Sequence, residues 1–263
     1  MTAVPLPPRW SNGSTTLGAW MFRREPILSE VAGAAGYDYV CIDMQHGLAS
    51  YTDTAAMLQA LGRSAATPLV RVAWNDPGVI GRVLDAGALG VIIPMVNNAD
   101  DARRAVSACR YAPVGARSVG PLTATIRHGS QYLQTANEYV ACIPMIETIE
   151  AVERIDEILS VPGIDAVYIG PADLSMTLGL PPLPDHDDVR FTDALAAVVE
   201  ACNRNDVIPG VHANPSLAQA RSEQGFRMIT VGFDQTPVMA ALRADLAAAR
   251  SGIERSSAAP NGD

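Results

Sequence analysis

Residues 139–180, YVACIPMIETIEAVERIDEILSVPGIDAVYIGPADLSMTLGL, contain two apolar, strand-like runs separated by a helical pattern. The runs are VACIPMI and DAVYIG, and between them apolar residues recur every three or four positions over 149–159. Strand, helix and strand of this length predict a parallel βαβ unit. Glu147 directly follows the first strand, and Asp173 lies three residues beyond the glycine that ends the second. Both carboxylates should therefore lie at one edge of the sheet, where a metal ion or a substrate could bind.

The same alternation of strands and helices continues through the rest of the chain. Apolar runs predict further strands at 14–21, 37–43, 68–74, 90–96, 206–212 and 226–234, with helical patterns between them. The strands are apolar throughout, as expected when both faces of a parallel sheet are buried. The repeats, spread over about 240 residues, favour an α/β fold that closes as a (β/α)₈ TIM barrel. Neither a GxGxxG nor a P-loop motif supports a doubly wound nucleotide-binding fold.

The predicted domain organisation is one barrel domain with short flanking segments. The barrel spans 14–250, after a Pro-rich, irregular arm at 1–13 and before a polar tail at 251–263 that is expected to be disordered. Residues 111–130 form a long Gly- and Pro-punctuated loop, and a loop of that length in a compact domain is functional or disordered.

Composition excludes several classes of function. The chain is 48% hydrophobic and 18% charged, as in globular proteins with a full core. Its net charge of −9 opposes nucleic acid and anionic membrane surfaces as partners. No apolar run is long enough to span a membrane, and the first residues lack the features of a signal peptide. Four dispersed cysteines predict neither a disulfide framework nor a zinc cluster. We therefore expect a cytoplasmic protein that acts on small molecules.

The chain contains no lysine, because all 19 of its basic residues are arginine. A Schiff base with the substrate requires a lysine amine or an exposed N-terminal amine, and pyridoxal phosphate requires the same anchor. The sequence therefore excludes imine chemistry and a pyridoxal cofactor.

Four polar side chains should meet at the C-terminal rim of the barrel, where active sites of this fold lie. They are His46, Arg71, Glu147 and Asp173, and they come from four different strands. Each also has a purely structural interpretation: a hydrogen-bonded loop histidine, half of a buried ion pair, a carboxylate at a helix dipole and a helix N-cap, respectively. Their convergence on one rim favours a functional site.

Two carboxylates without a Cys or His cluster suit a hard cation such as Mg²⁺ or Mn²⁺, with water and substrate oxygens as further ligands. They do not suit a structural zinc. A 2-oxo acid could fill the open positions, and the cation would then make its C3 protons acidic. Arg71 would stabilise the enolate oxygen, and His46 would transfer the proton.

Six segments in this order resemble the HpcH/HpaI aldolase family: YDYVCIDMQHG, PLVRV, GVIIPMV, RYAPVGARSVG, MIETIEAVERIDEIL and GIDAVYIGPADLS. The resemblance extends over roughly 15–250. It implies a class II, metal-dependent pyruvate aldolase with a TIM barrel of the phosphoenolpyruvate/pyruvate-domain type. By this resemblance, Glu147 and Asp173 bind a divalent metal (Mg²⁺ or Mn²⁺, with Co²⁺ as a further candidate), His46 is the acid/base, Arg71 stabilises the enolate, and Gly170, Pro171, Ala172 and Asp173 receive the pyruvate carboxylate.

The resemblance also implies an assembly. The family has an aspartate, matched here by Asp85, that raises the basicity of the histidine. The sequence places Asp85 before the fourth strand, at the opposite end of its own barrel, so it would act from a neighbouring subunit. Its alternative is an ordinary residue at a helix end, and Asp43 could instead orient the imidazole. We expect a homo-oligomer, in this family a hexamer, with sites at the subunit interfaces.

Three positions depart from the family pattern. Met145 stands where many members have a glutamine that contacts substrate, Gln45 stands where some have glutamate beside the histidine, and Ser118 replaces a loop glycine. We expect the pyruvate half of the site to survive these changes. The aldehyde is therefore left unassigned.

The predicted function is reversible cleavage of a 4-hydroxy-2-oxo acid to pyruvate and an aldehyde, through a metal-bound pyruvate enolate. Two alternatives use the same enolate: oxaloacetate decarboxylation, and a lyase acting on a CoA thioester, for which no lysine is available to bind the phosphates. An alternative of another class is a non-catalytic barrel that binds 2-oxo acids. A complete His/Arg/Glu/Asp set speaks against it, because binding alone does not require a proton shuttle.

Overall fold

In the computed structural model, which describes residues 3–258, the strands form one closed parallel barrel in the order β1 to β8. Each strand pairs with the next along the chain, and β8 pairs with β1 to close the barrel. This confirms the predicted (β/α)₈ fold. The strands are β1 Thr16–Met21, β2 Tyr39–Asp43, β3 Thr67–Arg71, β4 Gly90–Ile93, β5 Ala141–Ile146, β6 Ala166–Ile169, β7 Ile208–His212 and β8 Met228–Phe233.

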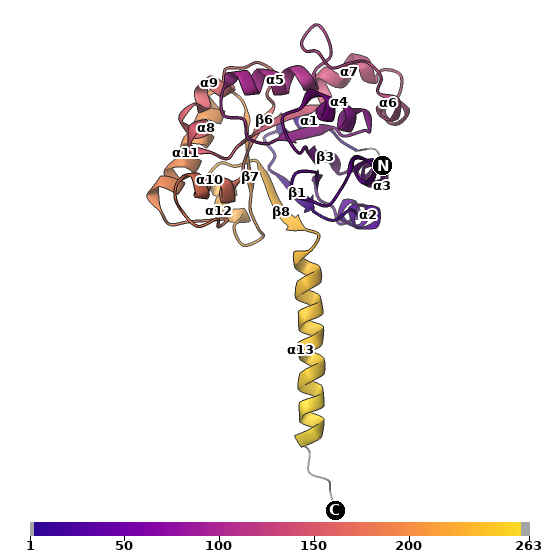
Figure 1. Cartoon of the computed structure of the whole chain (residues 1–263), viewed down its shortest axis with the longest axis vertical. Helices are drawn as coiled ribbons and strands as arrows, with labels where there is room; N and C mark the ends of the chain where they lie inside the picture. The colour runs from indigo at the N-terminus through magenta and orange to yellow at the C-terminus, as the bar shows by residue number, and fades with distance from the viewer. Residues whose placement is uncertain (1–2, 259–263) are drawn as a thin grey trace, which may run out of the picture.

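Helices surround the barrel (Figure 1). Several of them begin at residues whose side chains cap the helix. Ser50 and Asp53 form a capping box at the start of α3. Asp76 caps α4, which begins at Pro77, because its side chain accepts a hydrogen bond from the backbone N–H of Val79. The helices are α1 Leu6–Trp10, α2 Pro26–Ala34, α3 Tyr51–Leu61, α4 Pro77–Asp85, α5 Ala99–Cys109, α6 Leu122–His128, α7 Tyr132–Tyr139, α8 Ile149–Glu153, α9 Ile155–Leu159, α10 Pro171–Thr177, α11 Val189–Arg204, α12 Ala218–Glu223 and α13 Thr236–Ala258. Within the described part of the chain, none of them is long and apolar enough to cross a membrane.

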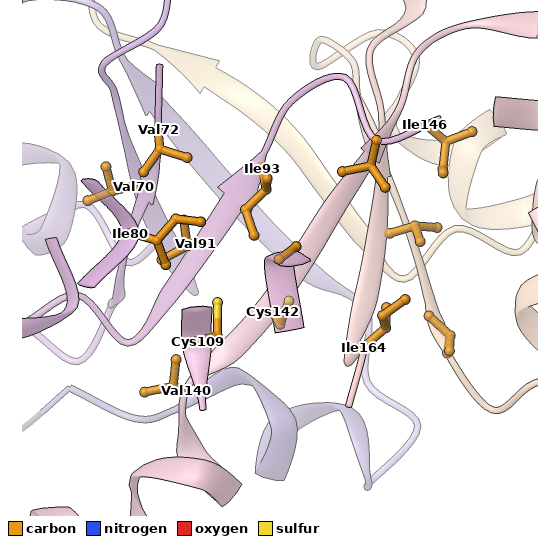
Figure 2. Close-up of a cluster of buried hydrophobic side chains, with 14 of the residues drawn as sticks. Val70, Val72, Ile80, Val91, Ile93, Cys109, Val140, Cys142, Ile146 and Ile164 are labelled. Atoms are coloured by element: carbon orange, nitrogen blue, oxygen red, sulfur yellow. The ribbon is translucent and has the colours of Figure 1, made fainter. Parts of the chain in front are cut away.

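The core has two parts, one on each side of the strands. Outward-facing side chains such as Val70, Val91 and Cys142 pack against the helices (Figure 2). Inward-facing side chains such as Leu69, Ile92 and Ile143, together with aromatic rings, fill the barrel. Each fully buried aliphatic side chain stabilises the fold by about 1.5–3 kcal/mol. Burial on both faces explains why the strands are apolar along their whole length.

The N-terminal arm is not irregular as predicted, because Leu6–Trp10 forms a short helix. The two prolines in its first turn cost no helical hydrogen bond, because the backbone N–H groups of a first turn have no intrahelical partner. Leu6 and Trp10 are buried in the core inside the barrel, and the Trp10 indole donates to Thr16 Oγ1 at 3.1 Å. The arm is held by this burial, which local sequence does not reveal.

Three further expectations are corrected. The predicted tail is helical as far as Ala258, because an alanine-rich helix tolerates the roughly 1 kcal/mol cost of one glycine; residues 259–263 lie outside the described part. The predicted loop 111–130 contains α6. The single helix expected over 149–159 is two short helices, interrupted at Arg154, whose φ of −106° and ψ of 18° are not helical.

The last helix, α13, projects away from the barrel (Figure 1). It exposes apolar side chains at Val238, Met239, Leu242 and Leu246. The helix that follows β8 in this fold ordinarily packs on the outside of the barrel. In a single chain the outer surface beside β8 is therefore not covered by α13, although α12 contacts β8.

Candidate active site

The C-terminal rim of the barrel encloses a cavity of about 280 Å³. His46 follows β2, Arg71 ends β3, and Asp173 lies in the first turn of α10, and all three line this cavity. The predicted substrate-binding residues Gly170, Pro171 and Ala172 line it too. The structure thus brings together side chains that are more than a hundred residues apart in sequence.

Glu147 directly follows β5 and lies buried beside this cavity. A Cβ atom at Gly170, which lines the cavity, would stand 2.8 Å from Glu147 Oε2. The absence of that side chain leaves the carboxylate room at the cavity wall. All four predicted rim residues therefore belong to one site.

Arg71 is held rigidly by Asp43. Its Nε donates to Asp43 Oδ1 at 2.9 Å and its Nη2 donates to Oδ2, which is the bidentate geometry of a strong ion pair. The Trp20 indole also donates to Asp43 Oδ2, at 3.2 Å. Burial alone would raise the pKa of Asp43, but the hydrogen bonds and charge of Arg71 outweigh burial and lower it. Asp43 is therefore charged, and the guanidinium has a fixed position.

Asp43 also fixes the turn that carries His46. Its Oδ1 accepts from the backbone N–H groups of Gln45 at 2.9 Å and His46 at 3.3 Å. In the described chain Asp43 makes no hydrogen bond with the His46 imidazole. Asp43 was considered as a residue that orients the imidazole; in the structure it contacts the backbone of the turn and not the ring.

The two oxygens of Glu147 have different environments. Oε1 accepts from the backbone N–H of Met95 at 2.7 Å, whereas Oε2 is buried without a partner among residues 3–258. Met95 has a φ of 55°, a strained value for a residue with a side chain, and such strain is typical of functional sites. Burial raises the pKa of Glu147 to about 6, and the nearby charge of Asp173 adds to this rise.

The donor set fits a hard divalent cation. An orphaned, buried carboxylate oxygen beside a second carboxylate is an unfavourable arrangement that a cation would relieve. In the described part of the chain, no group of three or more His, Cys, Asp and Glu side chains is arranged to hold a metal. The site therefore offers two carboxylates, which leaves ligand positions for water and substrate oxygens.

Asp85 lies elsewhere. It ends α4, and its Oδ1 accepts from Arg117 Nη2 at 2.7 Å. The Arg117 guanidinium stacks over Tyr111 at 4.4 Å and donates to the Tyr132 hydroxyl at 3.1 Å. Asp85 and Arg117 line a second cavity, of about 440 Å³, and His46 is not among the residues that line it. Within one chain Asp85 does not reach the other predicted residues, so a role at the site would require a second subunit.

Sequence reasoning missed several residues of the cavity wall: Trp20, Phe22, Tyr168 and His212. His212 is the last residue of β7, so the rule that strand ends carry functional groups would have selected it. The three aromatic residues lie in or beside apolar strands, and nothing in their sequence context separates them from core residues.

The model of the HpcH/HpaI aldolase/citrate lyase family matches residues 16–241. The chain belongs to this family. A hydroxypyruvate/pyruvate aldolase of Rhizorhabdus wittichii is 40% identical over 243 residues, which are 92% of this chain and 97% of that protein. A 4-hydroxy-2-oxo-heptane-1,7-dioate aldolase of Salmonella typhimurium is 38% identical, with 92% of each chain covered. The predicted family and the prediction of an aldolase are thereby confirmed.

Solved structures agree with this assignment. The crystal structure of a family member from Burkholderia cenocepacia superposes with a TM-score of 0.86 at 33% identity, covering 93% of this chain and 98% of that one. Aldolases of the family generally depend on divalent metals. Glu147 and Asp173, the two carboxylates at the cavity, are the side chains of this site that are chemically suited to bind such a metal.

Proposed function

We propose that this chain is a divalent-metal-dependent aldolase that reversibly cleaves a 4-hydroxy-2-oxo acid to pyruvate and an aldehyde. The observation that carries the proposal is that Glu147 Oε2 is a buried carboxylate oxygen without a partner in the described chain. The Glu147 carboxyl group is also close enough to Asp173 for the charge of Asp173 to raise its pKa. Arg71 and His46 line the adjacent cavity. The names of the R. wittichii and S. typhimurium relatives, both aldolases of 2-oxo acids, support the same reaction.

Glu147 and Asp173 would hold the cation, with Mg²⁺ or Mn²⁺ as first candidates and Co²⁺ as another. When bound, the cation supplies Lewis-acid polarisation of the substrate's 2-oxo group. The backbone N–H groups of Ala172 and Asp173, in the first turn of α10, have no intrahelical partners and would bind the substrate carboxylate. The 2-oxo group would then lie in the same cavity that Arg71 lines.

Cleavage breaks the bond between C3 and C4. His46 takes the proton of the 4-hydroxyl, as a general base, while that carbon becomes the aldehyde. The electron pair of the broken bond moves toward the 2-oxo oxygen, and Arg71 stabilises the resulting enolate charge. Protonation of C3 then yields pyruvate, and the reverse sequence forms the bond.

We also infer that the protein is a homo-oligomer. Leu242 and Leu246 of α13 are 61% and 50% exposed, and Ile27 and Val31 of α2 are 71% and 58% exposed. Packing of α13 from one copy on the uncovered surface of a second copy would bury apolar surface on both, and oligomer interfaces are built from such surface. Assembly would also let Asp85 approach a neighbouring site, as the expected hexamer requires.

The proposal is tested by cation binding and cleavage together. Glu147→Gln should abolish Mn²⁺ binding, measured by titration calorimetry, and cleavage of 4-hydroxy-2-oxo acids. Glu153→Gln on α8 changes the same chemical group at a distance from the cavity and should alter neither. Turnover of oxaloacetate or CoA esters without aldol cleavage would favour the decarboxylase or thioester lyase. Pyruvate binding without any turnover would favour the non-catalytic barrel.

A further inference from the structure

His212 is a polar residue of the cavity wall without a role in the reaction described above. Its neighbours on the wall include Trp20, Phe22 and Met145, which offer no hydrogen-bond acceptor of comparable strength. Its ring packs edge-on against Trp20, with centroids 5.0 Å apart, and is tilted against Phe233 at 5.1 Å. The imidazole therefore has a fixed position at the end of β7.

The hydrogen bonds around His212 decide which ring nitrogen carries the proton. The Tyr168 hydroxyl donates its only proton to Thr230 Oγ1. Tyr168 Oη lies 3.1 Å from His212 Nδ1 and must therefore accept there, so Nδ1 bears the hydrogen. Burial, with the charge of Arg71 as a lesser cause, lowers the pKa of His212 to about 4, which keeps the ring neutral at physiological pH.

A neutral ring protonated on Nδ1 leaves a free lone pair on Nε2. Within residues 3–258 this atom makes no hydrogen bond, and it is not among the buried side-chain atoms that lack a partner. It is therefore accessible from the cavity that His212 lines. A neutral acceptor of this kind binds a hydroxyl group, whereas an ionised carboxylate has no proton to donate to it.

We propose that His212 Nε2 accepts a hydrogen bond from a hydroxyl group of the substrate and so makes this enzyme selective for hydroxylated substrates. The inference rests on the proposed aldolase function and specifies its substrate class. The hydroxyl has two sources, C3 of a 3-hydroxy-2-oxo acid and the carbon next to the carbonyl of a hydroxyaldehyde. Both present the same donor to Nε2, and the experiment below distinguishes them.

Two matched substrate pairs test the proposal: 3-hydroxypyruvate against pyruvate with one aldehyde, and glycolaldehyde against acetaldehyde with pyruvate. For each pair, the preference is the ratio of kcat/KM for the hydroxylated substrate to kcat/KM for its partner. In one of the two pairs this ratio should be about three- to tenfold higher in the wild-type enzyme than in His212→Leu. The pair that responds identifies the source of the hydroxyl. His212→Gln, which can present an amide oxygen near the position of Nε2, should regain part of the preference.

Tyr168→Phe provides a matched control for the tautomer. It leaves the imidazole in place but removes the hydroxyl oxygen that accepts from Nδ1–H, so the proton is no longer held on Nδ1. The preference for the hydroxylated substrate should therefore lie between those of wild type and His212→Leu. A purely structural role for His212 would change stability in these variants without changing the ratio between the paired substrates.

A measurement without turnover decides the case even if His212→Leu does not fold. In wild-type protein labelled with ¹⁵N on histidine, long-range proton–nitrogen spectra should show His212 with a proton on Nδ1 and none on Nε2. The Nε2 signal should move with a hydroxylated substrate and stay in place with its deoxy partner. A proton on Nε2, or equal substrate ratios in wild type and folded His212→Leu, would overturn the inference. Absence of metal-dependent pyruvate enolisation in wild type would instead refute the aldolase function.

Discussion

Arg71 and Asp43 lie directly opposite each other in the register of β3 and β2, and the Arg71 guanidinium donates hydrogen bonds to both carboxylate oxygens of Asp43. Arg71 is 7% exposed and Asp43 is fully buried. A positive charge is thus fixed at the cavity before substrate arrives, and preorganised charge of this kind is among the largest contributions to catalysis.

Asp43→Asn should be strongly destabilising and should reduce turnover. The substitution leaves the buried guanidinium without its counter-charge, and breaking a buried pair costs about 3–5 kcal/mol of unfolding free energy. Urea denaturation measures the loss. Asp100→Asn, which removes the carboxylate of the exposed pair with Arg103, is the control and should cost less than about 1 kcal/mol. Equal losses in the two variants would contradict the role of the Arg71–Asp43 pair.

Stability should fall between pH 6.5 and pH 4 partly because of His212. The folded protein protonates His212 only near a pKa of about 4, whereas in the unfolded chain the imidazole takes up its proton below its ordinary value of 6.5. The unfolded state then binds more protons, so the contribution of His212 is present above pH 6.5 and is lost as the pH falls toward 4, by at most about 1.4 kcal/mol per pH unit. Melting temperatures at several pH values should decline less steeply for His212→Leu, and identical slopes would be inconsistent with the lowered pKa.

Gly170→Ala should weaken cation binding about tenfold or more while leaving the backbone unstrained. Its φ of −94° suits alanine, but the new methyl group would stand 2.8 Å from Glu147 Oε2 and 3.0 Å from Met145 Cε. Because Met95 holds the other oxygen of Glu147, the carboxylate has little freedom to move aside. Mn²⁺ titration measures the effect. Gly120→Ala, where the added methyl group meets nothing within 4 Å, is the control and should bind Mn²⁺ like wild type.

Aspartate at both Leu242 and Leu246 should reduce the size of the assembly. These side chains are exposed on α13 in a single chain, and charges there would oppose their burial against a second copy. Light scattering coupled to size-exclusion chromatography measures the mass. Arg243→Gln alters an exposed charge on the same helix without removing apolar surface and should keep the wild-type mass. An unchanged mass in the double variant would show that α13 is not part of the subunit interface.

The barrel and the four rim residues were predictable because each depends on one strand and its ends. Apolar runs predict the strands, and Glu147 directly follows one of them in the sequence. Arg71 was predicted inside the strand 68–74, and the structure ends that strand at Arg71. The pairing of Asp43 with Arg71 was not predictable, because it depends on the register between β2 and β3. The tautomer of His212 depends on Tyr168 and Thr230, from two other strands.

The two ends of the chain were mispredicted for a similar reason. Leu6 and Trp10 form a helix because they are buried in the core inside the barrel, which local composition does not reveal. The direction of α13 is a property of the whole molecule. Residues 236–250 have the pattern of an ordinary barrel helix, and nothing in that pattern predicts that the helix projects from its own barrel.

The most direct test of the account is exchange of the C3 protons of pyruvate in D₂O, followed by NMR with Mg²⁺ and with a chelator. The assay requires no knowledge of the aldehyde. We predict exchange that requires the cation, is lost in Glu147→Gln and Asp173→Asn, and is retained in Glu153→Gln. Exchange that persists in chelator, or its absence with every divalent cation tested, would contradict enolisation of pyruvate at this site.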